Sequence, residues 1–120
     1  MQKRFLTILL VLAIVIAFCG LALGGNSSTV TQDGLDNEAA VNQTGNDNLV
    51  IITQTGNENI ANQDQLGSNN DGYIEQVGNK NIADQWQVDV LITIYNKARI
   101  YQNGIENYAY QEQHGNKNEA

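Results

Sequence analysis

Short runs of alternating polar and apolar side chains, separated by glycine-containing segments, cover most of the chain. In the run NLVIITQ (residues 48–54), every second residue falls on the same face of an extended strand, so Val50, Ile52 and Gln54 share one face. The segment GNEN that follows (residues 56–59) suits a tight turn, because glycine takes positive φ at no steric cost and asparagine tolerates the left-handed region. The pattern therefore predicts strands of about seven residues joined by turns of about four.

This pattern recurs with a period of eleven residues, and each unit reads Q-x-G-x-x-N-x-(A/V/G)-x-x-x. The repeated glutamines are Gln32, Gln43, Gln54, Gln65, Gln76 and Gln87. Glycine lies two residues after the first five of them, at Gly34, Gly45, Gly56, Gly67 and Gly78. Asparagine lies five residues after the same glutamines, at Asn37, Asn48, Asn59, Asn70 and Asn81. After an interruption, the pattern returns with Gln102, Gly104 and Asn107, and again with Gln113, Gly115 and Asn118.

The interruption lies in an irregular unit, at about residues 88–101. Asp89 stands where glycine belongs and Ile92 where asparagine belongs, and the interval from Gln76 to Gln102 is two units plus four residues. One insertion of four residues accounts for the offset. We expect an extended strand pair with a longer turn near Asn96 and Lys97; the alternative is a segment for assembly or partner binding.

An eleven-residue period also fits a right-handed coiled coil. That interpretation fails here because every regular unit carries glycine and asparagine, which are poor helix formers. Two strand-turn units instead make one coil, so the sequence predicts an all-β chain, a β-solenoid of about four such coils with cross-β, amyloid-like stacking. Proline is absent throughout, as laddered strands require.

Stacking at an interval of two units places identical side chains above one another, about 4.8 Å apart. Gln43 would then lie under Gln65, and Gln54 under Gln76. At that distance one side-chain amide can donate to the next, so a buried column of glutamine or asparagine satisfies itself. We therefore interpret the repeated glutamines and asparagines as structural ladder residues and the repeated glycines as turn residues.

The N-terminal residues have a different composition from the repeats. Lys3 and Arg4 precede an apolar run from Phe5 to Cys19, and small residues follow it. This layout is typical of a secretory signal peptide. We predict a signal helix within residues 1–24, a short segment at 25–31 and the repeat domain at 32–120.

Two other interpretations of the N-terminus remain open. The run from Phe5 to Leu23 is just long enough to span a bilayer as an uncleaved anchor. The other makes Cys19 a lipid-attachment site, although bulky Phe18 precedes it where a small residue is expected.

Charge and reactive residues exclude several classes of function. After residue 25 the chain has 4 basic and 13 acidic residues, a net charge of 4 − 13 = −9, which disfavours nucleic-acid binding. The single histidine, His114, has only Glu112 near it in sequence, and no paired carboxylates or calcium-binding repeat are visible. We expect no enzyme activity, no cofactor and no metal site.

The repeat resembles that of the curlin family. It is carried by QDGLDNEAAVNQ from Gln32, QTGNENIANQDQ from Gln54, QVGNKNIADQWQ from Gln76 and QNGIENYAYQEQ from Gln102. The resemblance implies a secreted subunit of curli, extracellular amyloid fibres that support biofilm matrix and adhesion. It also implies self-assembly, other curlin-type subunits as partners, and export through a dedicated outer-membrane pore with accessory factors.

Alternatives to a major fibre subunit stay open from the sequence. The family often has serine six residues before glutamine in alternate units, where this chain has asparagine, which leaves open a minor, nucleating subunit. A monomeric β-solenoid that binds a surface or polysaccharide is the other alternative, because aromatic residues such as Trp86 face outward in the predicted strands.

Overall fold

The fold is described by a computed structural model covering residues 14–19, 25–89, 95–115 and 117–120. In this part of the chain every regular element is a strand. The strands are β1 (Ile14–Cys19), β2 (Ser27–Asp33), β3 (Glu38–Thr44), β4 (Leu49–Thr55), β5 (Ile60–Leu66), β6 (Asp71–Asn79), β7 (Ile82–Val88), β8 (Lys97–Ile105) and β9 (Tyr108–His114).

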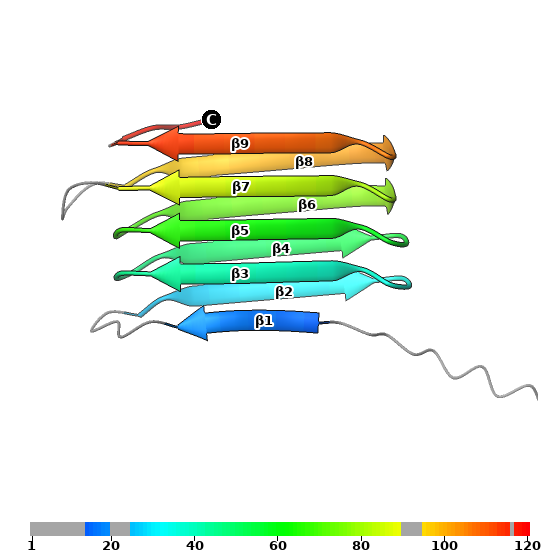
Figure 1. Cartoon of the computed structure of the whole chain (residues 1–120), viewed down its shortest axis with the longest axis horizontal. Helices are drawn as coiled ribbons and strands as arrows, with labels where there is room; N and C mark the ends of the chain where they lie inside the picture. The colour runs from blue at the N-terminus through cyan, green and yellow to red at the C-terminus, as the bar shows by residue number, and fades with distance from the viewer. Residues whose placement is uncertain (1–13, 20–24, 90–94, 116) are drawn as a thin grey trace, which may run out of the picture.

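The strands form two parallel sheets that face each other (Figure 1). Sheet A has the order β1-β3-β5-β7-β9, and sheet B has the order β2-β4-β6-β8. The chain crosses from one sheet to the other at every turn, so each strand pairs with the strand two elements further on. Gln43 is in register with Gln65, and Gln54 with Gln76, at the predicted interval of two repeat units. The predicted all-β solenoid of about four two-unit coils is confirmed.

The core between the sheets is a single thin layer of inward-facing side chains. Sheet B contributes mainly aliphatic residues, among them Val50, Ile52 and Ile74, which are at most 1 % exposed. Sheet A contributes small residues such as Ala61 and Ala83, which are fully buried. Small side chains on one wall let the backbones of the two sheets approach closely, so little apolar surface is buried and hydrogen bonds must supply part of the stability.

The turns differ in one respect from the expectation. The repeated glycines do take positive φ, for example 115° at Gly56. The asparagines of the repeated motif do not; instead, the residue before each of those seven is left-handed, as at Asp47 (φ 55°) and Glu58 (φ 55°). The asparagine side chain binds backbone groups in the ladder, so the preceding residue takes the left-handed conformation even where it is not asparagine.

The irregular unit contains the four-residue insertion that the sequence predicts. β7 pairs with β9, and β6 with β8, at an interval four residues longer than that of the regular coils, and Asn96 lies just before β8. Residues 90–94 of this unit lie outside the described part of the chain.

The expected helix at the N-terminus is not found where the structure describes that region. Ile14–Cys19 forms strand β1, parallel to β3 and in register from Ile14 with Glu38 to Cys19 with Gln43. An apolar, β-branched segment fits the otherwise unpaired edge of a sheet, which explains the strand in this context. The rest of the predicted signal segment lies outside the described residues. Among those that are described, no helix is long and apolar enough to cross a membrane.

Close stacking of the turns makes a first prediction at Gly56. A Cβ atom built there would lie 1.8 Å from the carbonyl oxygen of Gly78, in a backbone with φ of 115°. We expect Gly56→Ala to lower the free energy of unfolding by more than about 2 kcal/mol, since clash and backbone strain both act. Gly25→Ala is the matched control, because nothing lies within 4 Å of its added Cβ. Equal urea midpoints for the two variants would contradict the stacking.

Candidate functional site: amide ladders and their ends

Glutamine side chains form one continuous hydrogen-bonded ladder on each sheet. In sheet B, Gln32 Nε2 donates to Gln54 Oε1 (2.7 Å), and Gln54 Nε2 donates to Gln76 Oε1 (2.8 Å). Gln76 continues to Gln102 across the insertion (2.8 Å). The ladder of sheet A runs through Gln43, Gln65, Gln87 and Gln113, with bonds of 3.0, 2.8 and 3.2 Å. In every bond the glutamine earlier in the sequence is the donor and the later one is the acceptor, so both ladders have the same direction.

The same glutamines also tie the two sheets together. From Gln43 onward, each amide nitrogen donates a second bond to the carbonyl at the start of the preceding strand in the opposite sheet. Gln54 Nε2 binds Glu38 O (3.0 Å), and Gln65 Nε2 binds Leu49 O (3.0 Å). Because one side chain joins both the strand above and the sheet opposite, its position sets the coil geometry as well as the stacking.

Asparagine ladders run along both lines of turns. Asn59 donates its backbone N–H and its Nδ2 to Asn37 Oδ1 (3.0 and 3.1 Å). Asn59 Nδ2 also binds the carbonyl of Gly78 in the next turn (2.8 Å). The bonds between asparagines run from the later residue to the earlier one, opposite to the bonds of the glutamine ladders. On one side the line comprises Asn37, Asn59, Asn81 and Asn107. On the other side it comprises Asn26, Asn48, Asn70, Asn96 and Asn118.

Asn96 is a ladder residue that sequence reasoning missed. Its N–H donates to Asn70 Oδ1 (3.3 Å), and its Oδ1 accepts from the N–H of Asn118 (3.1 Å). A signal was present, because the four-residue insertion moves the asparagine position from 92 to 96. Asn96 also donates to Asp89, the residue that stands in the glycine position (2.5 Å). Burial raises the pKa of this Asp89 carboxyl, against hydrogen bonds from Ser68, Asn70 and Asn96 that lower it.

Another buried amide is poorly satisfied. Gln63 lies in the middle of sheet A, 1 % exposed, and neither of its amide atoms has a partner in the described part of the chain. The absence of a side chain at Gly72, in the opposite sheet, makes room for it, since a Cβ there would lie 1.2 Å from Gln63 Nε2. Val41, one strand below in the same register, is aliphatic. The interior thus contains laddered glutamines and one, Gln63, without partners, although Gln85 in the same column does donate to Gln111 Oε1 (2.9 Å).

The ladder ends differ from its interior. Gln32 Oε1, at the start of the sheet B ladder, is buried and has no partner among the described residues. At the other end, among the described residues, Gln102 Nε2 donates only to Ile82 O, and Gln113 Nε2 donates only to Lys97 O. One end therefore presents an unused acceptor and the other end presents unused donors.

The titratable groups show no catalytic arrangement in the described part of the chain. His114 bonds Glu112, whose pKa is lowered first by the hydrogen bond from Tyr110 and then by that from His114. All three side chains lie on the outer face of β9 and are largely exposed. No group of three or more histidine, cysteine or acidic side chains is placed to hold a metal ion in these residues.

The two kinds of buried glutamine give a prediction with opposite signs. Gln76→Leu removes a partner from both Gln54 and Gln102, so we expect it to lower the free energy of unfolding by about 2 kcal/mol or more. Gln63→Leu, the matched substitution at an equally buried site, removes an amide without partners and should raise it by about 1 kcal/mol. Urea denaturation of both variants measures the difference. A loss of equal size at the two positions would contradict the ladder account.

Comparison with known proteins agrees with the geometry. The curlin-associated repeat model matches residues 24–56 and 45–78, which together span β2 to most of β6. No characterised protein sequence and no solved structure matches the chain significantly. Proteins with this repeat are structural, non-enzymatic subunits of extracellular amyloid fibres. With a matching repeat, a two-sheet solenoid and amide ladders on every coil, the chain belongs to the curlin-associated repeat family.

Proposed function

We propose that this chain is the secreted structural subunit of a curli-like extracellular amyloid fibre that serves biofilm matrix and adhesion, and that its copies add end to end. The observation that carries the proposal is the unpaired, buried Gln32 Oε1 at one end of a directional ladder whose other end has donors to spare. Export by a signal peptide, and passage through a curli-type pore with accessory factors, belong to the same proposal.

The open side of β2 supports strand addition. Ser27 N donates to Asn48 O (2.8 Å), and Asp33 O accepts from Gly56 N (2.8 Å), so the odd-numbered residues of β2 face β4. Peptide groups alternate along a strand. The peptide groups of Ser28, Val30 and Gln32 therefore point away from β4, outward from the edge of sheet B. An unpaired edge of this kind can accept a strand of another chain.

The inward side chains at the two ends are compatible. Continued in register, Ile100 of one copy would lie against Val30 of the next, and Gln102 against Gln32. On sheet A, Gln113 would lie against Gln43. The spare amide hydrogen of Gln102 would then reach the unused acceptor of Gln32, and the ladder would continue from copy to copy.

Addition would also require two local changes. β1 covers the edge of β3, so removal of residues 1–24 would free that edge. Glu119 and Ala120 lie on the first part of β8, where Arg99 N donates to Ala120 O (2.9 Å), and an incoming β2 would displace them. A contact of so few hydrogen bonds is weak compared with the pairing of a full strand.

A minor, nucleating subunit would use the same ladder and edges. Seeding separates the two roles, because a nucleator present in trace amounts accelerates fibre formation by another curlin-type subunit. Asymmetric ends of this kind make a head-to-tail interface that does not close, as a fibre needs.

The edge of β2 provides the test of the proposal. Ser28 is exposed, and a proline there removes an N–H from the open edge while leaving the pairing with β4 intact. We expect Ser28→Pro to slow seeded elongation by about tenfold or more, since each lost backbone bond is worth about 1 kcal/mol and the ring also blocks the approach. Thioflavin fluorescence with preformed seeds measures the rate.

Two further variants make this experiment decisive. Ser28→Ala keeps the N–H and should elongate like the original chain. Thr29→Pro removes an N–H that faces β4 and should destabilise the subunit itself. The proposal is contradicted if Ser28→Pro elongates as fast as Ser28→Ala, or if the chain stays monomeric during prolonged incubation.

A further inference from the structure

The outer face of sheet A carries a groove that fibre assembly does not use. Outward side chains at successive strands form two columns, about 6.8 Å apart because they lie two residues apart along each strand. One column comprises Ala40, Asn62, Asp84 and Tyr110, and the other comprises Asn42, Asp64 and Trp86. The strands at Val41, Gln63 and Gln85 form the floor between them, and the hollow has a volume of about 520 Å³. The groove thus runs across the strands, along the axis of the solenoid.

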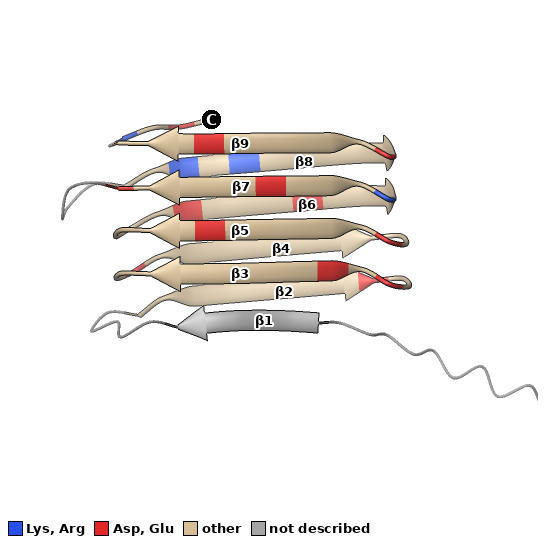
Figure 2. Cartoon of the chain, viewed as in Figure 1, with Lys and Arg blue, Asp and Glu red and all other residues tan. Residues whose placement is uncertain are grey.

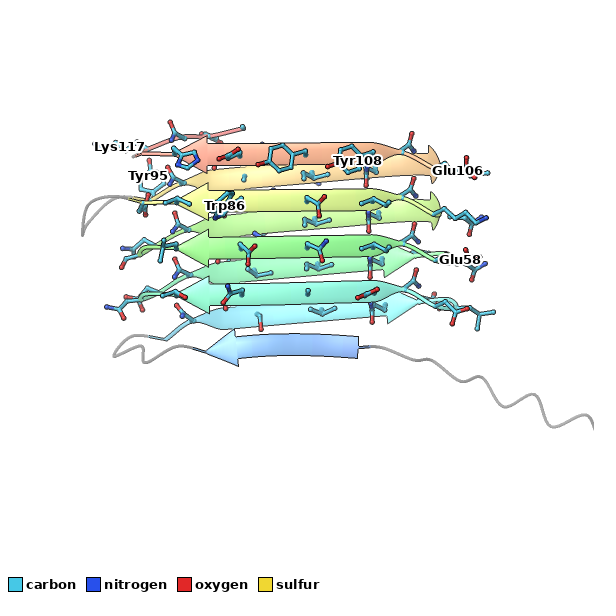
Figure 3. The ribbon with its side chains drawn as sticks, viewed as in Figure 1. Glu58, Trp86, Tyr95, Glu106, Tyr108 and Lys117 are labelled. Carbon is cyan, nitrogen blue, oxygen red and sulfur yellow. The ribbon has the colours of Figure 1, made fainter. Side chains whose placement is uncertain are left out.

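Two exposed rings lie at one end of this groove. Trp86 is 43 % exposed and Tyr110 is 54 % exposed, and each comes from a different strand. Figure 3 shows Trp86 on β7, with Tyr108 of β9 on the same face of the molecule. His114 contacts Trp86 edge to face, with ring centroids 5.9 Å apart, which holds the indole on one side. Such a ring offers an apolar face together with a polar edge.

The rest of the groove offers hydrogen-bonding side chains that form no ion pair with a lysine or arginine in the described part of the chain. Asp84 accepts from Asn62 Nδ2 (2.7 Å) and from the hydroxyl of Tyr108 (3.3 Å). The ion pairs within the described part of the chain involve neither Asp84 nor Asp64. Asn42 is exposed in the other column, which also contains Asp64 and Trp86. Carboxylate oxygens that accept, beside amides that donate and accept, suit a ligand rich in hydroxyl groups.

The charge of this face restricts its ligands. Figure 2 shows acidic positions on β3, β5, β7 and β9 and no basic position on these strands, whereas Lys97 and Arg99 lie on β8 of the other sheet. Phosphate-bearing or otherwise anionic polymers would be repelled. An extended peptide would pair with strand edges through its backbone rather than lie across a sheet face.

We infer that this groove binds a single chain of a neutral, unbranched polysaccharide, with sugar rings stacked on Trp86 and Tyr110 and hydroxyl groups bonded to Asp64, Asp84 and the neighbouring amides. A groove open along the solenoid axis accepts a linear polymer rather than a small compact ligand. This activity goes beyond the proposed fibre function and does not depend on it, because the groove lies within one subunit.

The only tryptophan of the chain lies in the groove, so its emission reports on binding directly. The probe is cellohexaose, a soluble neutral glucan, titrated into the purified protein. We expect a saturable change in Trp86 emission. Tyr110→Ala and Asp64→Ala should each weaken binding by about three- to tenfold, as the loss of one contact predicts. Tyr101→Ala is the matched control, since Tyr101 is equally exposed on the outer face of β8 in the other sheet.

Retention on insoluble cellulose gives a second measurement that does not need the indole as reporter. Trp86→Leu should be retained less than the original protein, and Tyr101→Ala should be retained equally. Three results would overturn the inference. The first is no saturable change of Trp86 emission with cellohexaose, and the second is binding of cationic chitosan oligomers alone, which would indicate charge attraction. The third is an emission change that follows the protein concentration instead of the sugar concentration. The last would mean that a second copy covers the face.

Discussion

The distance between neighbouring strands is the constraint on which the rest of the structure depends. Parallel strands stack about 4.8 Å apart, and a side-chain amide spans that distance with one hydrogen bond. A buried amide without a partner costs about 1–3 kcal/mol, so an interior with this many amides is stable only if most of them bond to a neighbour in register. The regular two-unit interval satisfies that condition, and the longer interval across the insertion satisfies it equally, because β8 and β9 resume the same register.

The directions of the ladders follow from the same constraint. Each glutamine must donate both to its neighbour and to the opposite sheet, as Gln54 does, so its acceptor is left for the strand below. The asparagines donate in the reverse direction because their second bond reaches the carbonyl of the next turn, as Asn59 does with Gly78. A stack of coils therefore has two chemically different ends, and the difference lies in buried atoms, where an unpaired group costs most.

Much of the fold was predictable from sequence because the period of the repeat determines the register in which the strands pair. Once Gln43 and Gln65 are known to stack, the sheets, the facing residues and the offset near Asn96 all follow. Local conformation was harder. The left-handed residue is Glu58 rather than Asn59, because the asparagine side chain is engaged in the ladder, and propensity alone does not show that. The missing partners of Gln63 depend on side-chain placement beside Gly72, which periodicity cannot supply.

Inward and outward positions of the same strands are under unequal constraints, and this separates assembly from recognition. An inward residue must match its neighbours above and below, so the column through Gln65 has little freedom to vary. An outward residue needs only to be compatible with its neighbours, so Asp64, Trp86 and Glu112 can follow one another in a single column. Stacking therefore does not explain why the outer faces of the two sheets differ in chemistry.

Acidic side chains on the outer face of sheet A also repel the same face of other copies, within the distance of about 10 Å over which salt does not fully screen charges. Contact between two sheet A faces is thus opposed by charge, whereas the end-to-end contact proposed above would be favoured by buried hydrogen bonds and would leave the outer face of sheet A open.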